Sequence, residues 1–292
     1  MPATDLRACA RTCNGAASMS PARRFRITAD DFGWTLAHNR AVERSVQAGT
    51  LTHASLMCTG HAVEHAVEVA FRNPRLGVGV HLSLCEGRPL TESSALQGLI
   101  SGAGEFHDGL TPLLARYAQG TLPLAAIATE WRRQIEHALG LGLTLSHLDG
   151  HKHVHLLPPL IRLTCELARE YRIPFVRSSY ESPSLGMIRR LPGWLALSSL
   201  SLAAKRVIRR QGLTTADHFI GFSTSGGMTE ARLLSAIDSA RAGLTEIMVH
   251  PAEESAELAP LIHRYPWART YRFAAEVAAL CSPKVAAALH AA

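Results

Sequence analysis

The amino-acid sequence predicts an α/β fold, a barrel of parallel strands similar to a TIM barrel, in which seven strands are clear. Two observations carry this prediction. From residue 25 onward, short apolar and β-branched runs alternate with segments of helical periodicity, which is the pattern of repeated βα units. The chain also has 292 residues without an internal linker or repeat boundary, a length that one such barrel routinely fills.

Seven segments have the composition of buried strands. They are residues 25–30, 51–58, 76–84, 144–148, 173–178, 217–222 and 245–250. No β-branched run follows residue 250. Either the barrel closes on seven strands, or its eighth strand is irregular.

Apolar positions at helical spacing lie between these strands. They predict helices over residues 37–48, 62–72, 124–139, 156–171 and 229–240, and a final helix over residues 271–280. Two long insertions, residues 86–123 and 179–216, follow the third and fifth strands. Loops at the carboxyl ends of barrel strands shape substrate sites, so both insertions are expected over the mouth of the barrel.

Residues 1–22 stand apart from this pattern. They contain no apolar run that could form the core of a signal peptide, and we expect a disordered extension followed by one domain over residues 23–292.

The six cysteines include no C-x-x-C pair and are read as reduced thiols of a cytoplasmic protein. The net charge is +6, but the basic residues lie in short clusters without interleaved aromatic residues, which gives no support for nucleic-acid binding.

The segment from residue 147 to 155 carries the strongest chemical signal. One aspartate and four of the fifteen histidines occupy alternate positions in it: His147, Asp149, His151, His153 and His155. Alternate residues of an extended chain share one face, and imidazoles and carboxylates are good ligands for divalent metals. The simpler alternative is a histidine-rich surface loop. The segment follows a buried strand, however, and barrel sites form at strand ends.

Two adjacent carboxylates, Asp30 and Asp31, end the first predicted strand. Buried neighbouring carboxylates repel each other unless a cation or a shared proton relieves them. One of the two can therefore bind a metal while the other serves as a base. The alternative for Asp31 is a cap at the start of the next helix.

Three further polar residues are expected at the same mouth. His81 lies well along the third strand, Arg177 at the end of the fifth and His250 at the end of the last. Each could be a structural polar group. Their shared position favours a site instead, in which His81 joins Asp31 and His151 as a set of two histidines and one carboxylate.

Four ordered motifs resemble those of the YdjC-like carbohydrate deacetylases. They are ADDFG at 29–33, GVHL at 79–82, HLDGHKHVH at 147–155 and VHP at 249–251. The resemblance covers nearly everything after Arg24. It implies a barrel enzyme that uses one divalent metal, magnesium or zinc, to remove acetyl groups from N-acetylated sugars, as chitooligosaccharide deacetylases do.

The resemblance also implies roles for individual residues. Asp31, His81 and His151 match the metal ligands, Asp30 matches the base that activates water, and His250 matches a histidine that protonates the departing amine. The other residues of the site are expected to bind substrate or to orient these groups: His147, Asp149, His153, His155 and Arg177.

Residues 51–57 and 224–230 look most like the branch associated with hopanoid biosynthesis, which implies an N-acetylglucosaminyl lipid as substrate. Residues 191–204 are uncharged and lie between the basic residues of the segment 189–210. The uncharged run is too short to span a bilayer, so the segment 189–210 forms either an ordinary rim helix or a dock at the inner face of the membrane.

Other functions remain open at this point. The alternatives are a soluble chitooligosaccharide substrate and a glycan- or lipid-binding barrel without catalysis. A metal phosphoesterase would need several basic residues over the mouth, and an iron oxygenase would be expected on an all-β scaffold. The sequence is compatible with either a monomer or a homodimer.

Overall fold

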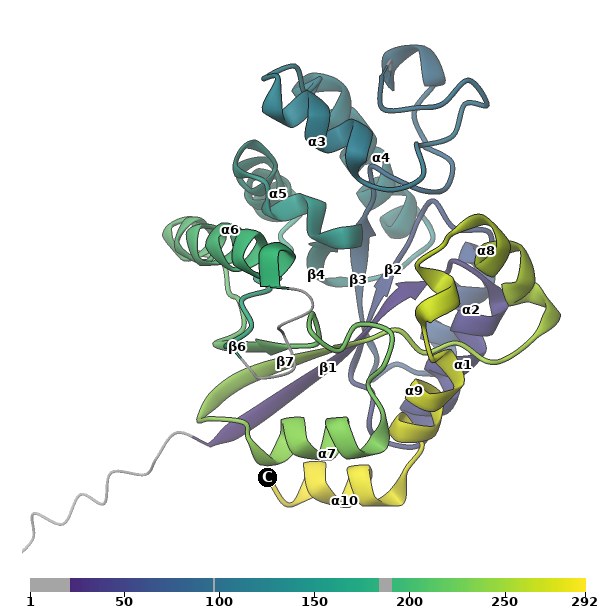
Figure 1. The fold of residues 1–292 in the computed structure, drawn as a ribbon, viewed down its shortest axis with the longest axis vertical. Coiled ribbons are helices and arrows are strands. Elements are labelled where there is room, and N and C mark those ends of the chain that lie inside the picture. The colour runs from purple at the N-terminus through teal and green to yellow at the C-terminus, as the bar shows by residue number, and fades with distance from the viewer. Residues whose placement is uncertain (1–21, 97, 184–190) are drawn as a thin grey trace, which may run out of the picture.

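The computed structural model describes residues 22–96, 98–183 and 191–292 (Figure 1). The expected N-terminal extension, residues 1–22, lies outside this range except for its last residue. Ala22 directly precedes the first strand, and its carbonyl oxygen accepts a hydrogen bond from Gly243 N at 3.4 Å.

Seven parallel strands form one curved sheet in the order β5-β4-β3-β2-β1-β7-β6. The strands are β1 Arg23–Phe32, β2 His53–Leu56, β3 Gly77–Leu82, β4 Leu145–Gly150, β5 Phe175–Val176, β6 His218–Ile220 and β7 Gly243–Val249. Helices surround this sheet (Figure 1). The predicted α/β barrel with seven strands is therefore confirmed, as a sheet that curls without closing completely.

The barrel stays open between β5 and β6, because no ladder joins these two strands within the described chain. Single bridges pair Phe175 with Thr214 and Glu181 with Phe219. The carboxylate of Glu181 also accepts hydrogen bonds from the backbone N and the Oγ of Ser223, both at 2.8 Å. A side chain thus connects the two edges where an eighth strand would lie, and residues 250–292 contain helices but no strand.

The α-helices begin and end within a few residues of most predicted boundaries. They are α1 Leu36–Gln47, α2 Val63–Arg72, α3 Thr111–Ala118, α4 Leu124–Gly140, α5 Pro158–Glu170, α6 Leu191–Arg210, α7 Glu230–Asp238, α8 Ala259–Arg264, α9 Phe273–Leu280 and α10 Pro283–His290. Short 3-10 turns are η1 Ser93–Leu96, η2 His151–Leu156, η4 Ala256–Leu258 and η5 Ala268–Thr270. No helix in the described ranges is long and apolar enough to cross a membrane.

Strand alternation divides the buried residues into two environments. On β1, Ile27 and Ala29 belong to the main apolar core, which the helices cover. The alternate residues Arg26, Thr28 and Asp30 are also buried, with at most 6% of each residue exposed. The polar set is continued on neighbouring strands by Ser55, His147, Asp149, Arg177 and Glu246. One face of the sheet therefore carries a buried polar network in place of the branched apolar layers usual in such barrels.

Two glycines of β3 make room for this polar network. A Cβ on Gly79 would lie 2.3 Å from His147 Nδ1, and a Cβ on Gly77 would lie 2.4 Å from His53 Cδ2. Both distances are far below van der Waals contact. The glycine pair in the sequence GVGV is thus explained by imidazole rings that occupy the side-chain space beside it.

Candidate metal centre at the mouth of the barrel

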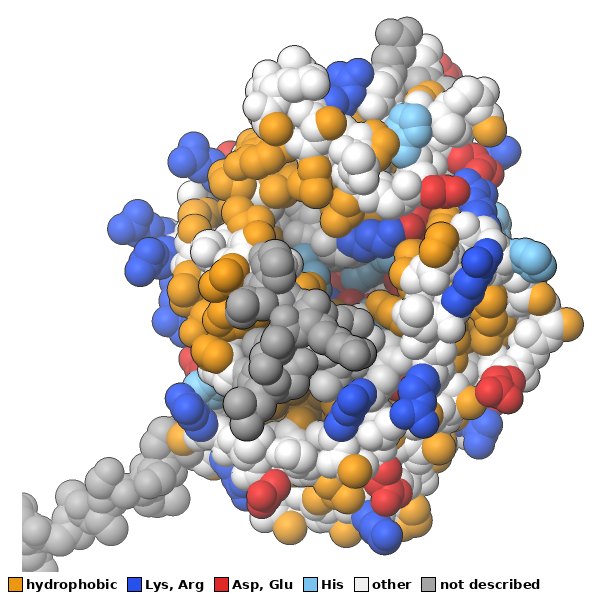
Figure 2. All heavy atoms as spheres, viewed as in Figure 1, with side chains coloured by type: hydrophobic (Ala, Val, Ile, Leu, Met, Phe, Trp, Pro, Cys, Tyr) orange, Lys and Arg blue, Asp and Glu red, His pale blue; other side chains and the backbone are white. Residues whose placement is uncertain are grey.

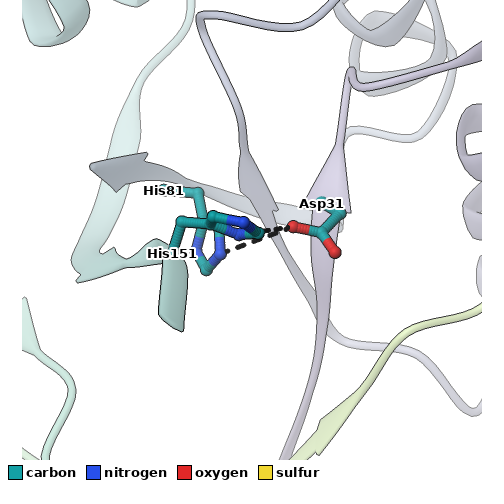
Figure 3. A group of neighbouring side chains, drawn as sticks. All are labelled: Asp31, His81 and His151. Carbon is teal, nitrogen blue, oxygen red and sulfur yellow. Dashed lines mark ion pairs between the residues drawn. The ribbon is translucent and has the colours of Figure 1, made fainter. Parts of the chain in front are cut away.

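Asp31, His81 and His151 meet at the carboxyl ends of β1, β3 and β4 (Figure 3). His81 Nε2 lies 3.6 Å and His151 Nδ1 lies 3.1 Å from Asp31 Oδ1. One potential ligand atom from each residue can be chosen so that all three lie within 4.8 Å of one another. The structure therefore brings together the three residues that the sequence analysis grouped as a ligand set.

The donor atoms of this group fit a divalent cation. Among the described residues, Asp31 Oδ1 is buried and accepts no hydrogen bond, although two imidazole nitrogens face it. Burial opposes ionisation of Asp31, but His151 and His81 outweigh this effect and hold its pKa below the ordinary value. Burial likewise disfavours protonated His151, yet the carboxylates of Asp31 and Glu86 raise the pKa of His151 to about 9. The carboxylate of Asp31 thus favours a positive charge between itself and the two imidazole rings.

Each histidine uses its other ring nitrogen to contact a second carboxylate. His81 Nδ1 lies 2.7 Å from Asp149 Oδ1, and His151 Nε2 lies 3.0 Å from Glu86 Oε2. Metal-binding histidines commonly have such partners, because the partner fixes the ring and its tautomer. Asp149 belongs to the histidine-rich segment and was predicted to be near the site. The sequence analysis did not identify Glu86, because no spacing in the sequence connects it to Asp31, His81 and His151.

Arg177 holds Asp30 beside the three ligands. Its Nη1 and Nη2 donate to Asp30 Oδ2 and Oδ1 at 2.7 and 2.8 Å, and its Nε donates to Glu246 Oε1 at 3.0 Å. Arg177 Nη1 also lies 2.8 Å from Asp149 Oδ2. A fully buried guanidinium therefore contacts three carboxylates, and their negative charges raise the pKa of Arg177 although burial opposes this.

With the histidines neutral, as metal ligands must be, the charges in this interior do not balance without a cation; without a metal, protonated His151 supplies part of the balance. Four carboxylates, those of Asp30, Asp31, Asp149 and Glu246, face two guanidinium groups, those of Arg26 and Arg177. With neutral histidines, two negative charges remain, which equals the charge of one divalent cation in magnitude. Buried uncompensated charge is costly, so a divalent metal next to Asp31 is compatible with the charges of this interior.

The chain leaves the extended conformation at His151, so the expected extended segment over residues 147–155 is wrong after Gly150. Residues Lys152 and His153 have positive φ angles of 51° and 59°, within the turn η2. His153 remains at the mouth, with Nδ1 3.0 Å from Ser179 Oγ. His155 turns away, and its Nε2 lies 3.1 Å from the carbonyl oxygen of Arg177.

His147 lies deeper than the mouth. Its Nε2 and Nδ1 lie 2.9 and 2.8 Å from the hydroxyl oxygens of Ser55 and Ser146. Burial holds the pKa of His147 well below its ordinary value. Ser55 also donates to Asp149 Oδ2 at 2.7 Å, and His147 Nε2 itself lies 3.9 Å from that oxygen, so His147 is linked to His81 through Asp149.

Left-handed backbone is concentrated at this site. Of the five non-glycine residues with positive φ in the described chain, four are Asp31, Glu86, Lys152 and His153. Such conformations cost roughly 1–3 kcal/mol each and persist where surrounding contacts enforce them.

Asp31 does not cap α1, because that helix is capped by Thr35, whose side chain accepts a hydrogen bond from His38 N.

A cavity of about 320 Å³ lies over Asp31, His81 and His151. Figure 2 shows histidine and acidic side chains at the floor of a hollow in this face of the molecule. The cavity is lined by Asp30, Asp31, His81, Leu110, His151, Lys152, His153, Phe222, Ser225, Met248, His250, Trp267 and Tyr271. It therefore combines ionisable groups with a wall of aromatic and other apolar side chains.

His250 shares this cavity with Asp30. Its ring packs against Tyr271 with centroids 5.2 Å apart, and its backbone N donates to Glu276 Oε2 at 2.5 Å. Within the described chain, its buried Nδ1 has no hydrogen-bond partner. Burial raises the pKa of Glu276, which lies on α9 and also accepts a hydrogen bond from Met228 N.

Known proteins are similar to this chain along most of its length. Residues 24–291 match the family model described as YdjC-like protein. A carbohydrate deacetylase from Thermoanaerobacter pseudethanolicus is 30% identical over 80% of this chain and 82% of its own length. One from Geobacillus stearothermophilus is 32% identical over 77% of this chain and 78% of its own length.

Two further similarities are more limited. A carbohydrate deacetylase from Oceanobacillus iheyensis is 38% identical, but the match spans 52% of this chain and 63% of that relative. A crystal structure from Enterococcus faecalis V583, provisionally described as a cellobiose-phosphate cleavage protein, superposes with a TM-score of 0.70. It covers 92% of this chain and 94% of its own at 23% identity, so it supports the fold alone.

Proposed function

This chain belongs to the YdjC-like protein family, and we propose that it is a metal-dependent carbohydrate deacetylase that hydrolyses the acetamide of an N-acetylated amino sugar. The names of its relatives support the reaction class. The observation that carries the proposal is one cavity that combines the group Asp31, His81 and His151 with Asp30 and His250.

Asp31, His81 and His151 would hold the cation, either magnesium or zinc. When bound, the cation supplies Lewis acidity that activates water and polarises the acetyl carbonyl group. Asp149 keeps the imidazole ring of His81 in place for this role.

Asp30 is proposed as the base. One of its oxygens, Oδ2, lies 3.9 Å from His81 Nε2, so the Asp30 carboxylate is next to the proposed ligands but is not one of them. The two hydrogen bonds from Arg177 fix the plane of the carboxylate, and each oxygen keeps a further lone pair. Asp30 can therefore accept a proton from water in the cavity while its own orientation stays constant.

His250 is proposed as the acid that protonates the leaving amine. It lines the cavity, and its backbone is anchored by Glu276, while its ring packs on Tyr271. The aromatic side of the cavity, formed by Phe222, Trp267 and Tyr271, offers the sugar ring apolar side chains to pack against. Hydrolysis would then proceed between a charged floor and an apolar wall.

We further propose a lipid-linked substrate, as in the N-acetylglucosaminyl hopanoid that the motifs imply, processed at the cytoplasmic face of the membrane. Helix α6 supports this refinement. It begins beside the cavity, since a Cβ on Gly193 would lie 3.7 Å from Phe222 Cζ. Leu195 and Leu202 are 52% and 42% exposed on it, and exposed arginines, including Arg206 and Arg210, follow toward its end. A soluble chitooligosaccharide is the alternative substrate.

The reaction is tested by metal analysis of the purified protein together with acetate release from N-acetylglucosamine glycans and glycolipids. We expect one divalent ion per chain and release of acetate. Asp30→Asn should keep the ion and lose most activity, and His250→Ala should keep the ion and lose turnover, most strongly for poor leaving groups. Wild-type protein that binds metal but releases no acetate from any such substrate would contradict the proposal.

Membrane contact is tested with liposomes that contain anionic lipid. Lys205 and Arg209 both contact Asp217, so neutralising them would also disturb the fold. Arg206→Gln with Arg210→Gln is the cleaner variant, and it should weaken binding by about 2 kcal/mol, or roughly 30-fold.

The control for this experiment removes the same charge elsewhere. Arg75→Gln with Arg241→Gln replaces two exposed arginines distant in sequence from α6. If both double variants pellet with liposomes as the wild type does, or if the wild type does not pellet, α6 is an ordinary rim helix and the soluble oligosaccharide is favoured.

A further inference from the structure

Glu86 is a buried carboxylate to which the proposed reaction gives no chemical step. It follows β3, is 1% exposed and has a left-handed φ of 62°. Its two oxygens accept hydrogen bonds from three donors: His151 Nε2 at 3.0 Å, Trp267 Nε1 at 3.1 Å and Lys152 Nζ. These donors come from two separate parts of the chain, the turn after β4 and the segment before α9.

The contact with His151 has a direct chemical consequence. A neutral imidazole carries one proton, and the acceptors around it decide which nitrogen holds that proton. With Glu86 next to Nε2, the proton is held there, and the lone pair of Nδ1 is directed toward Asp31 Oδ1, 3.1 Å away. Only this tautomer offers a metal the nitrogen that faces Asp31.

The contact with Trp267 connects the same carboxylate to the wall of the cavity. The Trp267 ring lies edge-on to the His151 ring with centroids 6.4 Å apart, and it packs on Tyr271 at 4.8 Å. Lys152 Nζ lies 5.7 Å from the centre of the same indole ring. The carboxylate therefore fixes one metal ligand and one wall residue relative to each other.

We propose that Glu86 is a positioning residue that sets the tautomer and orientation of His151, and through them the metal affinity of the site. This inference rests on the proposed function, in which His151 is a ligand. Glutamine at this position keeps the size of the side chain but offers one acceptor oxygen to three donors. Loss of such a partner typically weakens metal binding 10- to 100-fold.

The test compares Glu86→Gln with Glu130→Gln. Glu130 is fully buried, and its carboxylate accepts hydrogen bonds from Leu90 N and Thr91 N at 3.1 and 2.7 Å, so the control makes the same change at similar burial. Affinity for zinc is measured by competition with a chromophoric chelator. The visible spectrum of the protein loaded with Co²⁺ reports the ligand geometry, and a thermal melt shows whether each variant is folded.

We expect the wild type and Glu130→Gln to bind zinc alike, and Glu86→Gln to bind it 10- to 100-fold more weakly with an altered Co²⁺ spectrum. Equal affinity and an unchanged spectrum for Glu86→Gln would overturn the inference, as would an equal loss in Glu130→Gln. Failure of the wild type to bind any divalent ion would refute the proposed function as well. Metal binding by the wild type without acetate release would refute that function alone.

A second measurement keeps the inference testable if Glu86→Gln does not fold. Nitrogen-15 NMR of the wild type loaded with zinc reads the two ring nitrogens of His151 directly. We expect a protonated Nε2 and a metal-bound Nδ1. The opposite arrangement would overturn the role of Glu86, whatever the behaviour of the variant.

Discussion

Arg177→Met tests the charge network on which both the fold and the site depend. The guanidinium is fully buried and contacts the carboxylates of Asp30, Asp149 and Glu246 at 2.7 to 3.0 Å. Methionine keeps a long apolar side chain and removes the charge. The variant therefore leaves three carboxylates in the barrel without their shared cation.

The expected cost is large. Removal of one partner from a buried ion pair costs about 3–5 kcal/mol, and here three carboxylates lose the same partner, so we expect about 5 kcal/mol at neutral pH. Burial alone would raise the pKa of Asp149, and Arg177 is the largest influence that lowers it well below its ordinary value. Without Arg177, burial should dominate and raise this pKa.

The sign of the pH dependence follows from this reversal. In the wild type, the lowered pKa means that Asp149 stabilises the fold above the ordinary carboxyl pKa and that this contribution is lost only in strong acid. In the variant, a raised pKa means that the folded chain binds the proton more tightly than the unfolded chain. The cost of Arg177→Met should therefore be larger near pH 8 than near pH 5.

Urea unfolding followed by circular dichroism measures this cost at both pH values. Arg132→Met is the control, because Arg132 forms an ion pair with Glu170 at 2.9 Å in which the side chains are 42% and 45% exposed. Such exposed pairs contribute at most about 1 kcal/mol. A cost for Arg177→Met that equals the control, or that grows toward pH 5, would show that Arg177 does not hold these carboxylates in their charged form. Adding Glu246→Gln should recover part of the loss by removing one unpaired carboxylate.

Two further predictions concern stability. Gly79→Ala would place a Cβ 2.3 Å from the ring of His147, so the free energy of unfolding measured in urea should fall by about 3 kcal/mol. The control Gly102→Ala, at a position with open space, should lower it by less than about 0.5 kcal/mol. Equal losses would contradict the packing argument. Burial lowers the pKa of His38 to about 4. The stability that neutral His38 contributes is therefore complete above the ordinary pKa near 6.5. As the pH falls from there toward 4, the free energy of unfolding should decline by up to about 1.4 kcal/mol per pH unit. His38→Gln removes this one titrating group, so the free energy of unfolding should decline less steeply with falling pH. An unchanged slope would show that His38 does not titrate as expected.

The strands were predictable because each is a local pattern. The run predicted over residues 245–250 corresponds to β7, Gly243–Val249, and its polar end at His250 marks the mouth of the barrel. Closure of the barrel could not be predicted in the same way. The strand β5 consists of Phe175–Val176, and the gap beside it is bridged by Glu181, a residue with no recognisable local signal. Closure depends on contacts between distant segments, which periodicity does not encode.

The proximity of Asp31, His81 and His151 was predictable for a related reason, since each lies at or near the carboxyl end of a recognisable strand. The failure after Gly150 has a physical cause, because Lys152 adopts a left-handed conformation that sequence patterns associate with glycine. Glu86 also occupies such a conformation, and its contacts reach residues 65 and 181 positions away. Both features require the tertiary structure.

The polar interior explains why the site and the fold cannot be adjusted separately. In an ordinary barrel, apolar side chains fill the interior and the mouth alone carries the chemistry. Here Arg177 connects Asp30, at the mouth, to Glu246 on β7, and Asp149 connects Arg177 to the ligand His81. A change in one charge of this network alters the electrostatic environment of the others, because all of them are buried. The apolar core between the sheet and its helices must therefore supply the stability that allows this interior to retain its buried charges.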